Sequence, residues 1–283
     1  MADKEQRKAQ AAKHLSLMKG AFAAETAATI EAATIFEDGE GRALELPETP
    51  FEATKTSVTS AFATQAIHEA QGKTLVVSPT SFTRPGGNYE EGSFGPEQIL
   101  CSESNLYPVL CGMKKAYHDA NRGYSCGMLF TDRCMYLPDV MFIRNGAMRK
   151  ADVLAIPEPN RSRALENFRS ETECDSCLEG RIQAILNIAA AHEVQTLIMG
   201  AFGCGKQGFP PAQVIACIQK WIAGHPGAIE NIVFAVSRMA FDAFDEAFGA
   251  PKVEEAAAPA AAEEEENEFD LSSIELPEGV TLR

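Results

Sequence analysis

Short apolar runs separated by glycine- and proline-rich loops follow one another from Lys73 onward. These runs are continuously apolar, which is typical of strands buried on both faces of a sheet. Between several of them apolar residues recur at helical spacing, as in 182–189 and 214–222. Strands that alternate with helices predict an α/β fold with a largely parallel or mixed sheet. The predicted strands are 75–77, 140–143, 153–156, 197–199 and 232–236.

The first seventy residues have a different pattern, rich in alanine and in long straight side chains that favour helices. It predicts a helix over 4–36, an acidic turn at 38–41 and a second helix over 57–70. Leu15, Met18 and Phe22 fall roughly on one face of the first helix. We therefore expect an N-terminal helical extension, 1–70, that packs on an α/β domain, 71–250.

Beyond Gly249 the composition shifts to Ala, Pro and Glu, which predicts a disordered acidic tail over 251–283. The apolar residues at 269–276 are either part of this tail or a short docking peptide for a partner. The chain has 40 acidic and 25 basic residues, a net charge of -15. The tail holds ten acids and two bases, so -8 of this charge belongs to it and -7 to the rest. This balance argues against general binding to nucleic-acid backbones or anionic membranes.

No apolar run approaches the length of a membrane span, and the charged N-terminus lacks the apolar core of a secretion signal, so we expect a cytoplasmic protein. The eight cysteines are then expected to be reduced core thiols. Cys174 and Cys177 form one CxxC pair, but a zinc site needs four ligands and no second pair or nearby histidine pair accompanies it. Unpaired thiols are the favoured interpretation, and neither a metal nor a cofactor is expected.

Two glycine-rich loops follow predicted strands, at 81–98 and 200–208. Ligands of open α/β sheets bind at the carboxyl ends of strands, and glycine loops expose amides that can hold phosphate oxygens. The second loop contains GxGxxG, but too little chain follows for a dinucleotide-binding domain. It also contains GxxxxGK, but Gln207 stands where a P-loop needs Ser or Thr, and two prolines follow. A diphosphate such as that of ADP-ribose remains the best fit.

Several segments together resemble the microbial-type poly(ADP-ribose) glycohydrolases of the macrodomain superfamily, over roughly residues 20–250. The resemblance implies a macrodomain-like three-layer α/β/α sandwich with a mixed sheet, and binding of ADP-ribose or an ADP-ribosylated macromolecule. The segments that carry it are Pro85-Gly86-Gly87-Asn88, Pro96-Glu97-Gln98-Ile99-Leu100, Asn105-Leu106-Tyr107, Pro157-Glu158-Pro159-Asn160 and Gly200-Ala201-Phe202-Gly203-Cys204-Gly205.

The family has three loop glycines and a Gln-Glu-Glu triplet whose second glutamate is catalytic. Carried onto this chain, the third glycine becomes Asn88 and the catalytic position becomes Gln98. An amide does not titrate, so Gln98 can bind a ribose hydroxyl but cannot act as general acid or base. The resemblance implies that Glu97 contacts the ribose. Asn88 either keeps a left-handed loop geometry or marks a loop that no longer holds the ligand as the family's loop does.

The resemblance also implies the residues that hold the ligand. The first loop would surround the distal ribose and diphosphate, and the second would supply backbone amides to the diphosphate. Gln207 stands where family members commonly have an aromatic residue, and Phe202 is expected to pack beneath the loop. The implied ligand-binding residues are Gly86, Gly87, Asn88, Asn160, Gly203, Cys204, Gly205 and Gly208.

Three hypotheses for the function remain. The protein is an enzyme that hydrolyses ADP-ribosyl bonds with Glu97, Glu90 or Glu91 as the acid. Alternatively it is a reader that keeps the pocket and has lost the acid. A weaker third hypothesis makes the acidic tail the working part and the globular domain a scaffold.

Overall fold

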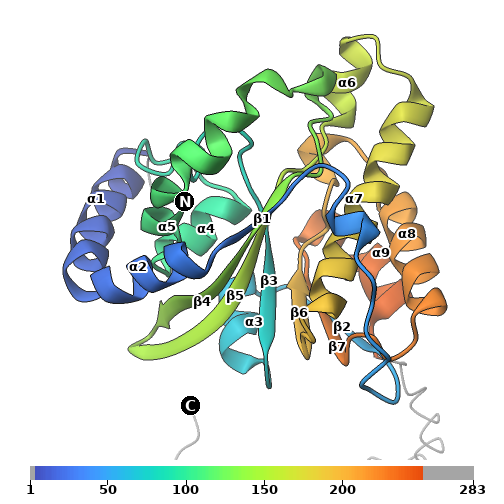
Figure 1. Ribbon diagram of the computed structural model, residues 1–283, viewed down its shortest axis with the longest axis horizontal. Helices are drawn as coiled ribbons and strands as arrows, with labels where there is room; N and C mark the ends of the chain where they lie inside the picture. Colours follow the sequence, from blue (N-terminus) through green and yellow to red (C-terminus); the bar gives the residue numbers. More distant parts are fainter. Residues whose placement is uncertain (1–3, 251–283) are drawn as a thin grey trace, which may run out of the picture. The chain divides into compact units, whose positions relative to one another are not determined.

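A seven-stranded mixed sheet forms the centre of the protein in the computed structural model, which describes residues 4–250 (Figure 1). Its strand order is β1-β4-β5-β3-β6-β7-β2. The five strands from β5 to β2 run parallel to their neighbours, whereas β4 pairs antiparallel with both β5 and β1. The strands are β1 (Thr34–Phe36), β2 (Lys55–Thr59), β3 (Thr74–Pro79), β4 (Cys134–Arg144), β5 (Ala147–Ile156), β6 (Thr196–Met199) and β7 (Asn231–Ala235).

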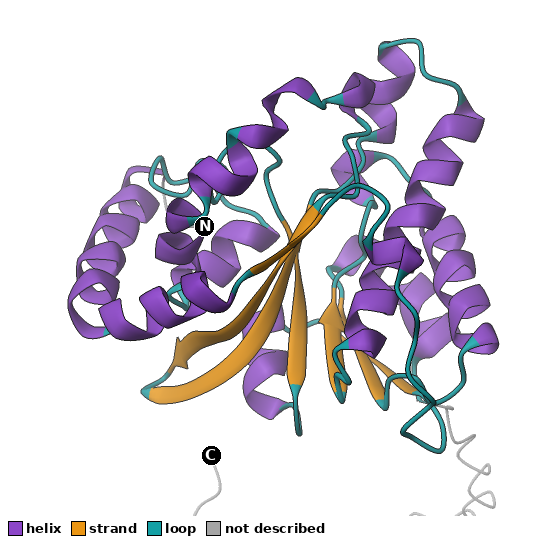
Figure 2. Cartoon of the chain, viewed as in Figure 1, coloured by secondary structure: helices purple, strands orange, loops and turns teal. Residues whose placement is uncertain are grey.

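Helices cover both faces of this sheet and complete three layers (Figure 2). One core cluster joins the sheet to α7, α8 and α9, and the other joins it to α1, α3, α4 and α5. The helices are α1 (Lys4–Ala21), α2 (Ala23–Ala32), α3 (Ala63–Glu69), α4 (Pro96–Ser102), α5 (Leu106–Gly112), α6 (Arg161–Glu166), α7 (Glu171–Ala191), α8 (Pro211–Gly224) and α9 (Arg238–Phe248).

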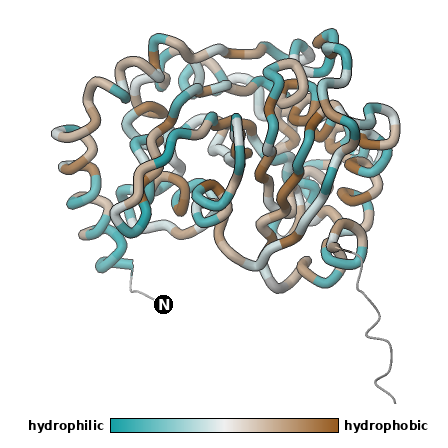
Figure 3. The backbone as a smooth tube through the Cα atoms, turned by 90° about the horizontal axis from the view of Figure 1, so that it is seen from below, coloured by the Kyte–Doolittle hydropathy of each residue, from teal (hydrophilic) through white to brown (hydrophobic). Residues whose placement is uncertain are grey.

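Strand β3 shows why the central strands are apolar throughout. Leu75 and Val77 lie in the cluster with α7 and α8, whereas Val76 lies in the cluster with α3 and α4. Successive side chains of a strand point to opposite faces, so a strand covered on both sides has no polar face. Hydropathy drawn along the backbone shows the same arrangement, with apolar stretches inside and polar ones at outer turns (Figure 3). The predicted three-layer α/β/α sandwich is confirmed.

The N-terminal segment differs from its prediction because it is not helical throughout. The expected helix over 4–36 consists of α1 and α2, followed by strand β1. The expected helix over 57–70 begins only at Ala63, because β2 precedes it. Both strands lie at the two edges of the sheet, where β1 pairs with β4 and β2 with β7. Their formation depends on these distant partners, and they are too short for a strand period to stand out in the sequence.

The described residues, 4–250, form one compact unit, and the predicted extension shares its sheet with the predicted α/β domain. All five predicted strands occur, within β3, β4, β5, β6 and β7. The predicted tail, 251–283, and its docking peptide lie outside the described residues. No helix within 4–250 is both long and apolar enough to cross a membrane.

Candidate functional site

Three neighbouring parallel strands, β5, β3 and β6, bring their carboxyl ends to one edge of the sheet. Pro79 at the end of β3 lies in register with Ile156 at the end of β5, and the Thr80 amide donates to the Ile156 carbonyl at 3.0 Å. The loops that follow these strands therefore start side by side. They include both predicted glycine loops and the segment 157–160.

The first glycine loop turns sharply at Gly86 and Gly87, whose φ angles are +60° and +58°. Such a conformation is costly for residues with a side chain. Gly86 also lies close against Tyr107, because a β-carbon placed on it would stand 2.5 Å from the ring. This contact joins the loop to α5. Position 86 therefore requires glycine for two reasons, its positive φ and its close contact with Tyr107.

Asn88 does not have the left-handed conformation that was one of its two interpretations, since its φ is not positive. Its side chain is exposed and accepts a hydrogen bond from Arg84. Its carbonyl accepts from the amides of Glu91 and Ser93, at 3.1 Å each, and these bonds close the loop tip. Asn88 therefore shapes the loop through its backbone, and a role in ligand binding stays a prediction.

Glu97 is buried at the foot of this loop with 4% of its surface exposed. One carboxylate oxygen accepts from the Thr80 hydroxyl at 2.5 Å, and the other accepts from the Ser81 amide at 3.1 Å. Burial raises the pKa of Glu97 to about 7, although these hydrogen bonds and one from Gly86 favour the charged form. A carboxyl group with this pKa is present in both protonation states near neutral pH.

Gln98 is held between the glycines of the same loop. Its Nε2 donates to the Gly86 carbonyl at 3.1 Å. A β-carbon on Gly87 would lie 2.9 Å from Nε2, and one on Gly95 would lie 2.9 Å from Oε1. Gln98 therefore follows Glu97 along α4 and contacts the glycine turn directly.

The spacer glutamates are placed differently from Glu97. Glu90 and Glu91 are both exposed, and Glu91 pairs with Arg84 at 3.1 Å. Among the three candidate acids, only Glu97 is buried within the loop.

In the second loop, two of the three amides predicted for the diphosphate already have partners inside the protein. The Gly203 amide donates to the Glu158 carboxylate at 2.8 Å, and the Cys204 amide donates to the Ala201 carbonyl at 3.0 Å. Gln207 also reaches Glu158, donating to its second oxygen at 3.0 Å. A carboxyl side chain thus occupies part of the predicted anion-binding loop.

Glu158 lies in one of the segments that resemble the family, but the sequence predicted no role for it. The signal available was its position, a carboxylate between two prolines directly after a buried strand. Burial raises the pKa of Glu158, opposed by the Gly203 and Gln207 hydrogen bonds and by the charge of Arg181. Arg181 is itself buried and donates to the carbonyls of Pro157 and Leu129, which hold the start of this loop.

The remaining predicted site residues have clear structural roles. The Asn160 side chain caps α6 by accepting from the Arg163 amide at 2.9 Å. Gly208 lies against α6, because a β-carbon there would stand 2.2 Å from the Ser162 hydroxyl. Phe202 is buried, as predicted. Ligand contacts of Asn160 and Gly208 stay predictions.

The cysteines are all free, but they are not all core thiols as predicted, because Cys111 and Cys126 are exposed. Cys174 and Cys177 lie near the start of α7, and the Cys177 thiol donates to the Leu129 carbonyl at 3.6 Å. Within residues 4–250, no three His, Cys, Asp or Glu side chains are grouped so that they could hold a metal ion. Cys204 is half-buried, and burial raises its pKa to about 12, so its thiol stays protonated near neutral pH.

We expect Gly86→Ala to destabilise the protein more than Gly205→Ala. Both glycines have a φ near +60°, which costs an alanine about 1–2 kcal/mol. Only Gly86 faces a neighbour, since nothing lies within 4 Å of a β-carbon on Gly205. Urea unfolding of the two variants isolates the contact with Tyr107. Equal losses would show that the ring moves away at no cost.

We also expect Glu97→Gln to change how stability depends on pH. The pKa of Glu97 is about 7 in the folded protein and about 4.3 in an unfolded chain, so the folded state retains its proton up to a higher pH. The resulting stabilisation is complete below the unfolded pKa and is lost as pH rises through 7. Between pH 5 and 8 the wild type should lose about 2.5 kcal/mol of unfolding free energy relative to the variant. If the unfolding free energies of the wild type and Glu97→Gln change with pH in the same way across this range, the pKa assigned to Glu97 is wrong.

Known proteins resemble this chain in sequence and in structure. The family model of the microbial-type PARG catalytic domain matches residues 5–145. No curated protein sequence matches the chain significantly. Poly(ADP-ribose) glycohydrolase from Thermomonospora curvata superposes with a TM-score of 0.73 at 23% identity, over 82% of this chain and 93% of that one.

Two structures with bound molecules are similar to the chain at slightly higher identity. The T. curvata enzyme bound to the inhibitor ADP-HPD has a TM-score of 0.70 and 25% identity, over 82% of this chain and 93% of that one. The Deinococcus radiodurans enzyme in complex with ADP-ribose has a TM-score of 0.69 and 26% identity, over 78% of this chain and 96% of that one. The matched domain and the shared fold confirm the predicted resemblance. Residues 5–145 therefore match the microbial-type PARG catalytic domain, and the chain shares the fold of bacterial poly(ADP-ribose) glycohydrolases.

Proposed function

We propose that the protein binds ADP-ribose between its two glycine loops and hydrolyses ADP-ribosyl O-glycosidic bonds, with Glu97 as the titrating group. The observation that carries this proposal is the buried Glu97 carboxyl group, hydrogen-bonded at the foot of the first loop. The D. radiodurans enzyme of the same fold, in complex with ADP-ribose, supports the choice of ligand.

Glycosidic cleavage needs a group that protonates the leaving oxygen and then activates water. Glu97 can do both near neutral pH because burial raises its pKa to about 7. Gly87 gives access to it, since a β-carbon on Gly87 would stand 3.4 Å from a Glu97 carboxylate oxygen. Gln98 supplies an amide that hydrogen-bonds a ribose hydroxyl and takes no part in proton transfer.

The second loop receives the diphosphate in this proposal. A phosphate oxygen that approaches the Gly203 amide must share or displace the Glu158 carboxylate, which already accepts from it. In its charged form Glu158 repels a phosphate group at the same amide, so it limits affinity for the diphosphate. Gln207 holds Glu158 in this position from the other side of the carboxylate.

Replacing Gln98 by Glu tests which residue transfers the proton. Loss of a general acid typically costs about 10²- to 10⁴-fold in rate, so Glu97→Gln should lower poly(ADP-ribose) hydrolysis by that factor from a measurable wild-type rate. Gln98→Glu adds a second carboxyl group at the cleaved bond and should raise the wild-type rate. Gln219→Glu adds the same charge on the exposed surface of α8 and serves as the matched control.

Calorimetric titration with ADP-ribose accompanies this hydrolysis assay. The hydrolase proposal fails if the wild type binds ADP-ribose without hydrolysing poly(ADP-ribose) and Gln98→Glu gains hydrolysis. That result would establish the protein as a non-hydrolytic reader of ADP-ribose. No binding at millimolar concentration would overturn the ligand as well.

Neutralising Glu158 should strengthen ligand binding. Glu158→Gln keeps an acceptor for the Gly203 amide and removes the negative charge from the loop. We expect the affinity for ADP-ribose to rise about tenfold, which corresponds to about 1.4 kcal/mol of repulsion removed. Glu166→Gln, at an exposed position on α6, controls for net charge. Unchanged or weaker binding would show instead that the carboxylate holds the loop in its binding conformation.

A further inference from the structure

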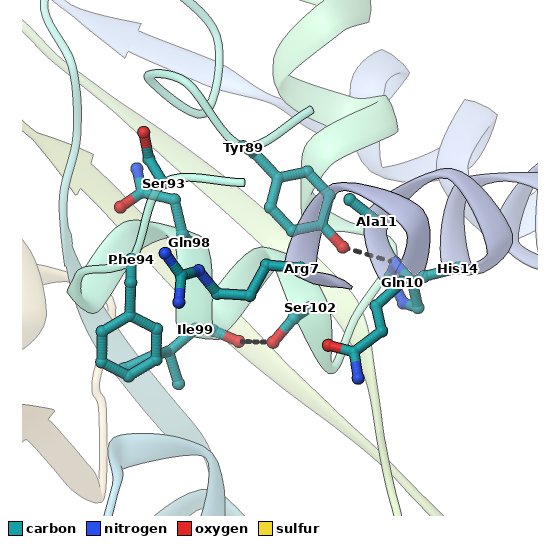
Figure 4. Close-up of a pocket in the computed structure, with 10 residues that line it drawn as sticks. All are labelled: Arg7, Gln10, Ala11, His14, Tyr89, Ser93, Phe94, Gln98, Ile99 and Ser102. Atoms are coloured by element: carbon teal, nitrogen blue, oxygen red, sulfur yellow. Dashed lines mark hydrogen bonds between the residues drawn. The ribbon is translucent and has the colours of Figure 1, made fainter. Parts of the chain in front are cut away.

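A pocket lies on the outer side of the first glycine loop, between this loop, α1 and α4 (Figure 4). Its volume of about 370 Å³ lies within the range of small-molecule sites. Helix α1 contributes Arg7 and His14, the loop contributes Phe94, and α4 contributes Gln98 and Ser102. Apart from Gln98, none of the residues given a functional role above lines this space.

The walls of the pocket are fixed to one another by specific contacts. Arg7 Nε donates to the Gly92 carbonyl at 2.7 Å, and the Tyr89 hydroxyl lies 3.0 Å from His14 Nδ1. Gly92 lies directly against α1, where a β-carbon would stand 2.3 Å from the Lys4 carbonyl oxygen. Helix α1 and the loop tip therefore form a preformed wall opposite α4.

Gln98 connects this pocket to the proposed active site. Its side chain lines the pocket and at the same time donates to the Gly86 carbonyl within the glycine turn. The neighbouring residue, Glu97, is the proposed acid and lies on the inner side of the same turn. A bond cleaved at Glu97 and Gln98 thus has the terminal ribose on the inner side and the pocket on the outer side.

The chemistry of the polymer defines what leaves from such a site. Hydrolysis breaks the bond between the anomeric carbon of the terminal ribose and the 2′ oxygen of the next adenosine. Water gives its hydroxyl to the carbon and a proton to the oxygen, so the leaving group is an adenosine with its own diphosphate attached. A site for this leaving group must adjoin the cleaved bond.

We propose that the pocket beside Gln98 binds the adenosine of the penultimate ADP-ribose unit, with Phe94 as the platform on which its base stacks. This inference rests on the proposed function. The Phe94 residue is 60% exposed, and the guanidinium carbon of Arg7 lies 5.9 Å from the centre of its ring. Stacking of a base on an exposed aromatic ring is a recurrent mode of nucleotide binding.

The charge of the lining also suits this ligand. Arg7 contributes a positive charge, and no carboxylate is among the residues of the described chain that line the pocket. In a protein with a net charge of -15, a pocket without acidic side chains is favourable for a nucleotide that carries phosphates. The Tyr89 and His14 pair adds polar atoms that can meet the edge of a base.

The test compares ADP-ribose with an ADP-ribose dimer, in rapid-mixing binding measurements made before hydrolysis. Phe94→Ala should leave the affinity for ADP-ribose unchanged and lower the affinity for the dimer about 5- to 150-fold. Phe94→Trp should restore dimer binding because it restores the aromatic face, whereas Phe94→Leu should not. Phe168→Ala, which removes a 98% exposed ring outside the pocket, should affect neither ligand.

Failure of the inference and failure of the proposed function give different results. If ADP-ribose binds the wild type but Phe94→Ala changes dimer binding no more than Phe168→Ala does, the pocket is not the leaving-group site. The inference also fails if Phe94→Ala weakens both ligands equally, because Phe94 then acts on the loop as a whole. If ADP-ribose itself does not bind the wild type, the proposed function fails first.

Discussion

Strands β5, β3 and β6 are paired in parallel and buried on both faces, so their carboxyl ends must meet at one edge of the sheet. The rest of the site depends on this constraint. It places the loop that carries Gly86, the segment that carries Glu158 and the loop that carries Gly203 next to one another, although Gly86 and Gly203 lie 117 positions apart in the sequence. A shift in the register of β3 by one residue would turn each of its side chains to the opposite face, which would disturb the packing of both core clusters and displace the first loop from its neighbours.

Two carboxyl groups, one buried and one half-buried, give this edge its electrostatic character. Glu97 lies at the first loop and Glu158 at the second, and burial raises the pKa of both. They differ in their partners, since Glu97 accepts from Thr80 and Ser81, whereas Glu158 accepts from the Gln207 side chain and from the Gly203 amide that the diphosphate is proposed to use. In the proposed reaction the first carboxyl group moves a proton and the second moderates ligand affinity.

The N-terminal helix α1 contacts the first glycine loop directly as well as packing on the core. It packs on the glycine loop through Arg7 and His14 and covers the core through Leu15 and Met18. Its removal would expose one wall of the loop that holds Gln98. The loop conformation and the helix are therefore parts of one arrangement, which explains why the segment before residue 71 does not behave as a separate layer.

The central strands could be predicted because their apolar runs are a local signal, and so could the two glycine loops that follow them. The edge strands β1 and β2 could not, since each is short and acquires its structure by pairing with a strand far along the chain. Asn88 shows a similar limit for a single residue. Its residue type is compatible with a left-handed turn, but the hydrogen bonds of the loop tip place it elsewhere.

The sequence by itself determined the fold class, the order of the central strands along the chain and the family resemblance, because these depend on residue types at fixed spacing. Tertiary structure alone decided the environment of each functional group. Glu97 and Glu158 are both glutamates that follow a proline, yet the pKa and partners of each arise from residues elsewhere in the sequence. Burial and hydrogen bonding are properties of the packed chain, so the electrostatics of this site exist only once the three loops have come together.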